Sequence, residues 1–413
     1  MAPQSWKILL LGIPGILAGQ IPASQTLSPN DSKLFQAEVQ RVERLLETAG
    51  DKCTVSYALA RTWASGGQYR EALSALQTAI DLNVGLDPSS DEIFGKLRAT
   101  NEFKLLLRRV REDTPPVTNS RVAFTFDAPD LLPEGIAADP RRKRIFLGST
   151  WRHGIIECTP TGDCRPLVKE GQDGLYEILG IKADPRDGSI WAVSNAAGES
   201  GLFHYGAPSG ELIRKYAVSR SGGVTTEAHS FNDLAISSQG DVFITDSRAG
   251  TVYWVSGTTG RLEVFDPKLK VEAPNGIALS SDDKTLYVAG YPDGITVVDI
   301  ASKSSHAIGH PQDLCLGTID GLSYFNGSLI AIQNGVMTPR VARYRLTGDL
   351  KDIESFEVLE RRNPLFDGIT TGAIADGVFY FVANTQLDKA AGGRIKPGAQ
   401  LNPLTILRID IAP

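Results

Sequence analysis

The feature that most constrains this chain is a short phrase that occurs six times between residues 121 and 413. Each copy has a residue that is usually polar, then Gly or Asp, two or three apolar residues, a turn, and an apolar run. The second residue of the phrase stands at positions 135, 180, 233, 276, 321 and 372, so the copies follow one another at intervals of 43 to 53 residues. Such a regular interval indicates a repeated structural unit.

Each interval is long enough for four short strands and their turns, and alternating runs such as Thr251–Val255 supply the outer strands. An all-β repeat of 40–50 residues is typical of propeller blades, whose circular arrangement removes exposed sheet edges. We therefore expect a mainly β chain, a six-bladed β-propeller over residues 121–413, preceded by a small α-helical region. Arg121–Phe126 and Leu404–Ile411 are expected to share the last blade and close the ring.

Residues 1–25 are typical of a secretory signal peptide. A single basic residue, Lys7, precedes the apolar run Ile8–Ala18, and small residues follow. The run is too short to cross a bilayer, and Pro14 interrupts it. We expect a secreted or extracytoplasmic protein, periplasmic if bacterial, with no membrane span after signal removal. An uncleaved N-terminal anchor is the alternative.

Residues 26–112 show helical periodicity, and residues 113–120, with Pro115 and Pro116, indicate a linker. Ser56–Leu82 resembles a single tetratricopeptide repeat, with its turn at Gly66 and Gly67. Because stacked repeats need about three units to bury a continuous core, a helical hairpin packed on the neighbouring domain or on itself is expected instead of a solenoid. A protein partner bound through these helices is a further expectation.

Charge and cysteine content narrow the classes of function. The net charge is −6 and there is no basic block, so nucleic acid is not expected as a partner. Cys158 and Cys164 flank a turn with Pro160 and Gly162 and are expected to form a local disulfide. Cys53 and Cys315 lie in different segments and are expected to be separate buried thiols.

The first position of the repeated phrase carries the chemistry. Rotation about a propeller axis brings equivalent positions to the same end, and four of the six residues there carry a carboxylate or amide oxygen: Glu134, Asn232, Asn275 and Asp320. Leu179 and Thr371 fill the other two slots. Oxygen donors without His or Cys favour Ca²⁺. Another divalent cation such as Zn²⁺, Mn²⁺ or Mg²⁺ is the alternative ion. Plain turn formation by Asn-Gly and Asp-Gly is the alternative explanation.

The phrases at Pro133–Gly135, Phe231–Asp233, Pro274–Gly276 and Asp320–Gly321 resemble those of the SMP-30/gluconolactonase/LRE-like family of regucalcin and gluconolactonases. The resemblance covers essentially all of residues 121–413. It implies that Glu134, Asn275 and Asp320 hold a divalent metal, that Asn232 completes the site or contacts substrate, and that Asp320 is the catalytic general base.

Sugar-lactone members of this family commonly carry Arg two residues before the third-blade Asn, where this chain has Ser230, preceded by His229. This departure argues against specificity for aldonolactones. We expect His229, Ser230 and Asn232 to contact the substrate, with a surface or structural role as the alternative for His229. The expected function is an exported metal-dependent lactonase or ester hydrolase acting on a small molecule, in which the metal polarises the carbonyl and Asp320 or metal-bound water acts as the base. The alternative is a non-catalytic binding or scaffold propeller with a structural Ca²⁺. No G-x-S-x-G, H-E-x-x-H or C-x-x-C motif supports another chemistry.

Overall fold

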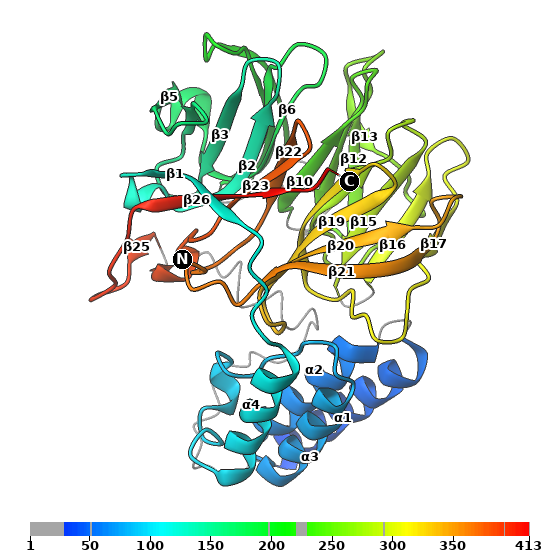
Figure 1. The fold of residues 1–413 in the computed structure, drawn as a ribbon. Coiled ribbons are helices and arrows are strands. Elements are labelled where there is room, and N and C mark those ends of the chain that lie inside the picture. The colour runs from blue at the N-terminus through cyan, green and yellow to red at the C-terminus, as the bar shows by residue number, and fades with distance from the viewer. Residues whose placement is uncertain are drawn as a thin grey trace.

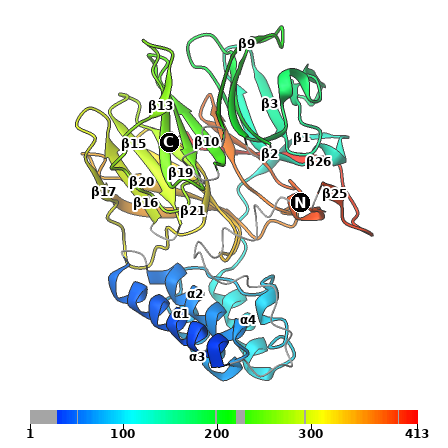
Figure 2. The same ribbon diagram turned by 180° about the vertical axis from the view of Figure 1, so that it is seen from behind.

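The structure is a computed structural model that describes residues 29–49, 52–196, 199–219, 229–291, 294–391 and 393–412. The expected signal segment, residues 1–25, lies outside the described residues. A helical unit lies at one end of a larger β-domain in both ribbon views (Figure 1, Figure 2). None of the helices in the described residues is long and apolar enough to span a bilayer.

The β-domain consists of six four-stranded antiparallel sheets, the blades of a six-bladed propeller. Blades 1 to 3 contain, from the innermost strand outward, β2 (Pro133–Asp139), β3 (Arg144–Ser149), β4 (Ile155–Cys158) and β5 (Cys164–Val168); β6 (Glu177–Ala183), β7 (Ile190–Ala196), β8 (Glu199–Tyr205) and β9 (Leu212–Ser219); and β10 (Phe231–Ile236), β11 (Val242–Asp246), β12 (Thr251–Val255) and β13 (Leu262–Val264). Blades 4 to 6 contain β14 (Ile277–Leu279), β15 (Thr285–Gly290), β16 (Gly294–Asp299) and β17 (Ser305–Ala307); β18 (Ile319–Phe325), β19 (Ser328–Gln333), β20 (Arg340–Leu346) and β21 (Ile353–Arg361); and β22 (Gly372–Ala375), β23 (Val378–Val382), β26 (Leu404–Asp410) and β1 (Arg121–Phe126).

The ring closes in blade 6. Strand β1 is the outermost strand there and pairs antiparallel with β26, from Arg121 opposite Arg408 to Phe126 opposite Leu404. The predicted six-bladed fold and its closure are therefore confirmed. The two ends of the propeller sequence share one sheet, so blade 6 has four strands like the other five.

The propeller core lies between neighbouring blades. Blades 1 and 2, for example, bury Phe146 and Ile155 against Ile190 and Phe203, all of which are at most 2% exposed. Alternate residues of an apolar run face the two neighbouring blades: Ile145 and Leu147 of β3 pack toward blade 6, and Phe146 packs toward blade 2. This explains why β3 is a continuous apolar segment.

The helical unit consists of α1 (Pro29–Thr48), α2 (Lys52–Ser65), α3 (Tyr69–Asp81), the short η1 (Glu92–Phe94) and α4 (Asn101–Asp113). Helices α2 and α3 form the expected hairpin, joined at Gly66 and Gly67. The apolar core of this unit also includes Val336 and Met337 from the propeller. The two parts of the chain therefore share one core.

Backbone and side-chain contacts fix the helical unit to blade 5. The amide of Asp87 donates to the carbonyl oxygen of Val336 (2.8 Å), and the amide of Thr338 donates to that of Gly85 (2.8 Å). The guanidinium of Arg340, 4% exposed, donates to the carbonyl oxygens of Val84 (3.2 Å) and Cys315 (3.4 Å). Burying a guanidinium group is costly unless its N–H groups keep their hydrogen-bond acceptors. Because the acceptors of Arg340 come from both parts of the chain, we infer that the helical unit and blade 5 form a fixed interface.

The expectation of two separate buried thiols is wrong. Cys53 of α2 and Cys315, in the loop before β18, form a disulfide with Cα atoms 6.0 Å apart. Their sequence separation of 262 residues hid the pairing, because a single sequence contains no information on which distant cysteines meet. Cys158 and Cys164 form the second disulfide, across the turn between β4 and β5.

The interface lies at the end of the propeller where the innermost strands begin. The loop of Cys315 leads into β18, and the Val336 loop follows β19, which is antiparallel to β18. Both loops therefore lie at the same end as Ile319, the first residue of β18. The helical unit is thus attached to the end of the propeller that carries the first position of the repeated phrase.

Two long stretches separate inner strands of the propeller. Most of the first, residues 199–227, forms the outer strands β8 and β9 of blade 2, and residues 220–227 lie outside the described residues. The second, Gln386–Pro403, connects β23 to β26 and contains η4 (Leu387–Lys389) and the short strands β24 (Ala390–Ala391) and β25 (Arg394–Ile395).

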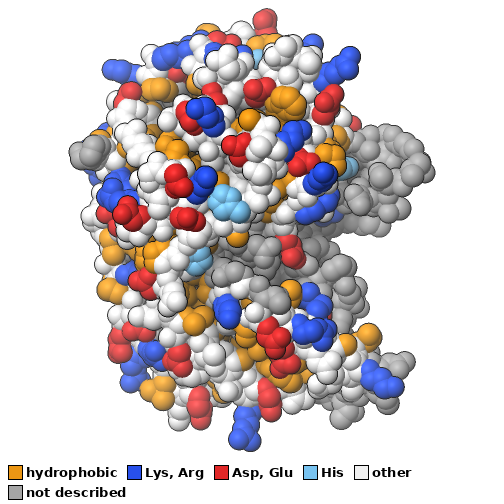
Figure 3. Space-filling view, turned by 90° about the vertical axis from the view of Figure 1, so that its right-hand side faces the viewer, with side chains coloured by type: hydrophobic (Ala, Val, Ile, Leu, Met, Phe, Trp, Pro, Cys, Tyr) orange, Lys and Arg blue, Asp and Glu red, His pale blue; other side chains and the backbone are white. Residues whose placement is uncertain are grey.

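A third view shows Lys and Arg interspersed with Asp and Glu on one side of the molecule (Figure 3).

We predict that replacing both Cys53 and Cys315 with Ser lowers the thermal unfolding midpoint more than replacing both Cys158 and Cys164. In the chain-entropy relation a cross-link over 262 residues stabilises by roughly 5.5 kcal/mol and one over 6 residues by roughly 2 kcal/mol. Calorimetry of both variants without reductant measures the difference. An equal or smaller shift for the Cys53–Cys315 variant would contradict the prediction.

Candidate metal centre

The four residues expected to bind metal stand at the beginnings of four innermost strands. Glu134 lies on β2, Asn232 on β10 and Asp320 on β18, while Asn275 lies two residues before β14. They come from blades 1, 3, 5 and 4. The fold therefore places all four at one end of the propeller, around its axis. We call these four residues, together with the polar side chains next to them, the ring.

Hydrogen bonds join these positions from blade to blade. Asn275 Nδ2 donates to Asp320 Oδ1 (3.0 Å) between blades 4 and 5, and Thr371 Oγ1 donates to the carbonyl oxygen of Glu134 (3.0 Å) between blades 6 and 1. Between blades 3 and 4, Ser247 Oγ accepts from Asn232 Nδ2 (3.0 Å) and donates to the carbonyl oxygen of Pro274 (2.6 Å).

Glycine at the second position of the phrase allows the blades to approach this closely. A Cβ atom on Gly135 would lie 2.1 Å from the carbonyl oxygen of Leu179, and one on Gly180 would lie 2.7 Å from Asp233 Oδ1. Likewise, a Cβ atom on Gly276 would lie 2.7 Å from the carbonyl oxygen of Asp320. The Gly of the phrase is therefore required by the contact between blades, in addition to any turn that it forms.

Three of the expected ligands carry a buried oxygen atom without a partner. Glu134 is 2% exposed, Asn232 is 7% exposed and Asn275 is half-buried. Glu134 Oε2, Asn232 Oδ1 and Asn275 Oδ1 have no hydrogen-bond partner among the described residues. A buried acceptor without a partner costs roughly 1–3 kcal/mol, so three such oxygens in one ring fit the requirements of a bound cation.

The carboxyl groups of this ring are perturbed by burial and by one another. Burial, and then the nearby Asp320 and Asp233, raise the pKa of Glu134 well above its ordinary value, while the Lys182 ammonium opposes this rise. Burial raises the pKa of Asp320 to about 7, although hydrogen bonds from Asn334 and Asn275 oppose it, and Asp233 adds to the rise. Among the described residues, the charges that act on Glu134 are therefore the carboxyl groups of Asp320 and Asp233 and the ammonium group of Lys182.

Among the described residues, no group of three or more His, Cys, Asp or Glu side chains is arranged to hold a metal ion. The candidate set consists of two carboxylates and two amides. Donors of this kind suit Ca²⁺, which binds carboxylate and amide oxygens together with water.

His229 and Ser230 are both engaged by one buried carboxylate. His229 Nδ1 lies 2.7 Å from Asp246 Oδ2, and the amide of Ser230 donates to Asp246 Oδ1 (2.9 Å). The imidazole also stands edge-on to the ring of Tyr253 (6.0 Å between centroids). Asp246 is fully buried and its neighbour Ser247 contacts Asn232, so these residues support the third-blade part of the ring.

Sequence reasoning missed three polar residues of the ring. Asn334, directly after β19, donates from Nδ2 to Asp320 Oδ2 (2.5 Å) and to the carbonyl oxygen of Ile369 (2.8 Å). Asp233 and Lys182 form an ion pair of 2.8 Å. Asn334 stands outside the repeated phrase and has no signal in the sequence, whereas Lys182 and Asp233 both depart from the pattern of the other copies.

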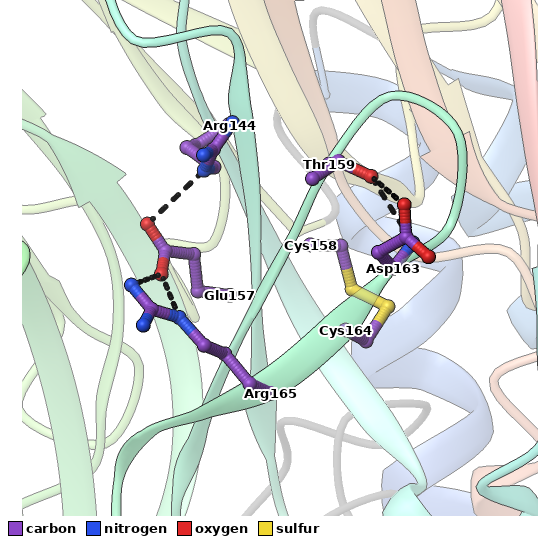
Figure 4. A pocket seen from close by; sticks show the side chains of 7 residues that line it. All are labelled: Arg144, Glu157, Cys158, Thr159, Asp163, Cys164 and Arg165. Atoms are coloured by element: carbon purple, nitrogen blue, oxygen red, sulfur yellow. Dashed lines mark hydrogen bonds and ion pairs between the residues drawn. A yellow bond between two sulfur atoms is a disulfide. The ribbon is translucent and has the colours of Figure 1, made fainter.

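A separate cavity of about 190 Å³ lies on the outer strands of blade 1, beside the Cys158–Cys164 disulfide (Figure 4). Glu157 is paired there with Arg144 (3.4 Å) and Arg165 (2.7 Å). The negative charge of Glu157 is balanced by two guanidinium groups. This cavity therefore differs from the ring, where the carboxyl group of Glu134 is close to two further carboxyl groups and only one ammonium group, that of Lys182, opposes them.

The sequence matches no protein-family model and no curated protein sequence. Solved structures do match. The allergen Mala s 1 of Malassezia sympodialis superposes with a TM-score of 0.55 at 15% identity over 70% of this chain and 96% of that one. A gluconolactonase from Xanthomonas campestris gives 0.49 at 14% identity (71% and 94%). The PQQ-bound aldose sugar dehydrogenase of Streptomyces coelicolor gives 0.48 at 17% identity (71% and 99%).

At 15% identity, the similarity to Mala s 1 shows the fold alone. Residues 121–412 of this chain form a six-bladed β-propeller like that of Mala s 1.

We predict that, in EDTA, the wild-type protein loses thermal stability as pH rises from 5 to 8, and that Asp320→Asn loses less. In the folded protein the pKa of Asp320 is about 7, whereas the carboxyl of an unfolded chain ionises near its ordinary value of 3.8. The stabilising contribution is therefore complete below about pH 4 and is lost as pH rises through about 7. Thermal midpoints measured across this range test the prediction, and parallel curves for both proteins would contradict it.

Proposed function

We propose that this protein is a metal-dependent hydrolase of lactones or esters, with Glu134, Asn232, Asn275 and Asp320 as the metal ligands. The observation that carries the proposal is the set of three oxygens on Glu134, Asn232 and Asn275 that are unpartnered among the described residues, in one ring with the Asp320 carboxyl. The alternative that these residues only form turns accounts for Asn-Gly and Asp-Gly, but leaves these oxygens unpaired.

The charges of the ring support a divalent cation. When ionised, Glu134, Asp233 and Asp320 carry three negative charges against the single positive charge of Lys182. A buried site with an excess of two negative charges is costly without a counter-ion. Ca²⁺ fits both this excess and the oxygen donors.

A divalent cation held in this ring supplies Lewis-acid polarisation of a substrate carbonyl. The chain supplies the remaining groups. Asp320 is the proposed general base, and the amide groups of Asn275 and Asn334 fix its two carboxylate oxygens. His229 and Ser230 lie just before Asn232 and are the proposed substrate contacts, with Asp246 orienting the imidazole. The proposed substrates are small lactones or esters.

An extracytoplasmic location is also part of the proposal. The two disulfides support it, because such bonds persist mainly in oxidising compartments. The expected signal segment points in the same direction.

A non-catalytic propeller with a structural Ca²⁺ is the second candidate. The observation that favours it is the deep burial of Glu134 and Asp320, at 2% and 4% exposure, at the end of the propeller to which the helical unit is attached. In that case the cation stabilises the ring, and the helices bind a protein partner.

We predict that Glu134→Gln and Asp320→Asn each weaken Ca²⁺ binding by more than about 100-fold, beyond the range typical of residues that only support ligands. Isothermal titration calorimetry on metal-free protein measures the affinity. Glu157→Gln is the matched control, because it removes an equally buried carboxylate from blade 1 and should leave the affinity unchanged. Unchanged affinity in both site variants would refute the assignment of the site.

Hydrolysis separates the two candidates. A panel of γ- and δ-lactones and aryl esters, assayed with Ca²⁺ and with EDTA, should show turnover that EDTA and Asp320→Asn both abolish. Ca²⁺ binding by the wild type without turnover of any compound favours the scaffold. Turnover that survives EDTA would contradict metal dependence.

A further inference from the structure

Lys182 breaks the pattern of the repeated phrase. Two residues after the Gly or Asp of each copy, the chain has Lys182 in the second blade but small or apolar residues elsewhere: Ala137, Ala235, Ala278, Ser323 and Ile374. The third blade breaks the pattern as well, because Asp233 occupies the slot that is Gly in the other five copies. These two departures, one basic and one acidic, occur in neighbouring blades.

The structure pairs the two departures. Lys182 Nζ lies 2.8 Å from Asp233 Oδ1, and the Asp233 side chain is 1% exposed while that of Lys182 is 22% exposed. Gly180 leaves the space for this carboxylate. The amide of Leu234 also donates to Oδ1 (2.8 Å), whereas Oδ2 has no hydrogen-bond partner among the described residues.

The pair belongs to the same electrostatic neighbourhood as the proposed ligands. Asp233 directly follows Asn232 and interacts electrostatically with Glu134 and Asp320, and Lys182 interacts with Glu134. Without Lys182, the ionised ring would carry three negative charges and no positive one. With it, the excess is two, which equals the charge of one divalent cation.

We propose that the ammonium group of Lys182 is a fixed positive charge that limits the ring to one divalent ion. By pairing with Asp233, it also lowers the affinity of the ring for that ion. Resting on the proposed metal site, this inference assigns Lys182 a positioning role: its ammonium holds Asp233 Oδ1 and withholds that carboxylate from the bound ion. Asp233 in turn keeps the ammonium beside β10, at 2.8 Å.

Ca²⁺ titration of metal-free protein at fixed pH and ionic strength tests this role. Wild type should bind one Ca²⁺. Lys182→Met removes the positive charge and should tighten binding about tenfold or more, which corresponds to about 1.4 kcal/mol. Asp233→Asn removes a negative charge and should weaken binding by a similar factor. The double variant removes both charges and should return to within about threefold of wild type, and Lys182→Arg, which keeps the charge, should bind like wild type.

The opposite signs of the two single variants distinguish this role from a structural one. If Lys182 only stabilises the fold, Lys182→Met lowers the thermal midpoint while the affinity for Ca²⁺ stays the same, and the proposal is overturned. If Lys182→Met does not fold, Asp233→Asn decides, since unchanged or tighter binding there also overturns it. A wild type that binds no Ca²⁺, with Glu134→Gln indistinguishable from it, overturns the proposed function and this inference together.

Discussion

The pairing of β1 with β26 is the constraint on which the rest of the structure depends. It closes six sheets into a ring, so the first residues of the innermost strands must surround a common axis. Glu134 and Asp320 are far apart in the sequence, yet the charge of one raises the pKa of the other. No local motif could produce this neighbourhood, because each blade supplies only one of the residues.

The same closure creates an electrostatic cost. Burying three carboxyl groups with one ammonium is unfavourable, and the raised pKa values of Glu134 and Asp320 express that cost in the metal-free protein. Chains retain such arrangements mainly where they serve a function. The helical unit is attached at this end of the propeller, through the Cys53–Cys315 disulfide and buried Arg340, so the loop that leads to Asp320 is held from both parts of the chain.

The repeated phrase was sufficient to predict the fold, the number of blades and the closing strands, because rotation converts a regular interval in sequence into one ring in space. It also predicted that Glu134, Asn232, Asn275 and Asp320 stand at the beginnings of innermost strands at one end of the propeller, which the strand order bears out, while their role as metal ligands stays a prediction. It could not identify Asn334, which lies in a loop outside the phrase, or the partners of Cys53 and Cys315, which depend on how the helices attach. Lys182 and Asp233 were visible as departures from the pattern, but only their ion pair shows that the departures compensate each other.

Anomalous scattering from crystals grown with Mn²⁺ or Tb³⁺ tests the central claim most directly, since it locates an ion without reference to activity. The account predicts a single strong peak at the propeller axis, within about 2.3–2.6 Å of oxygens from Glu134, Asn232, Asn275 and Asp320. A peak elsewhere, with these four side chains turned away from one another, would contradict it.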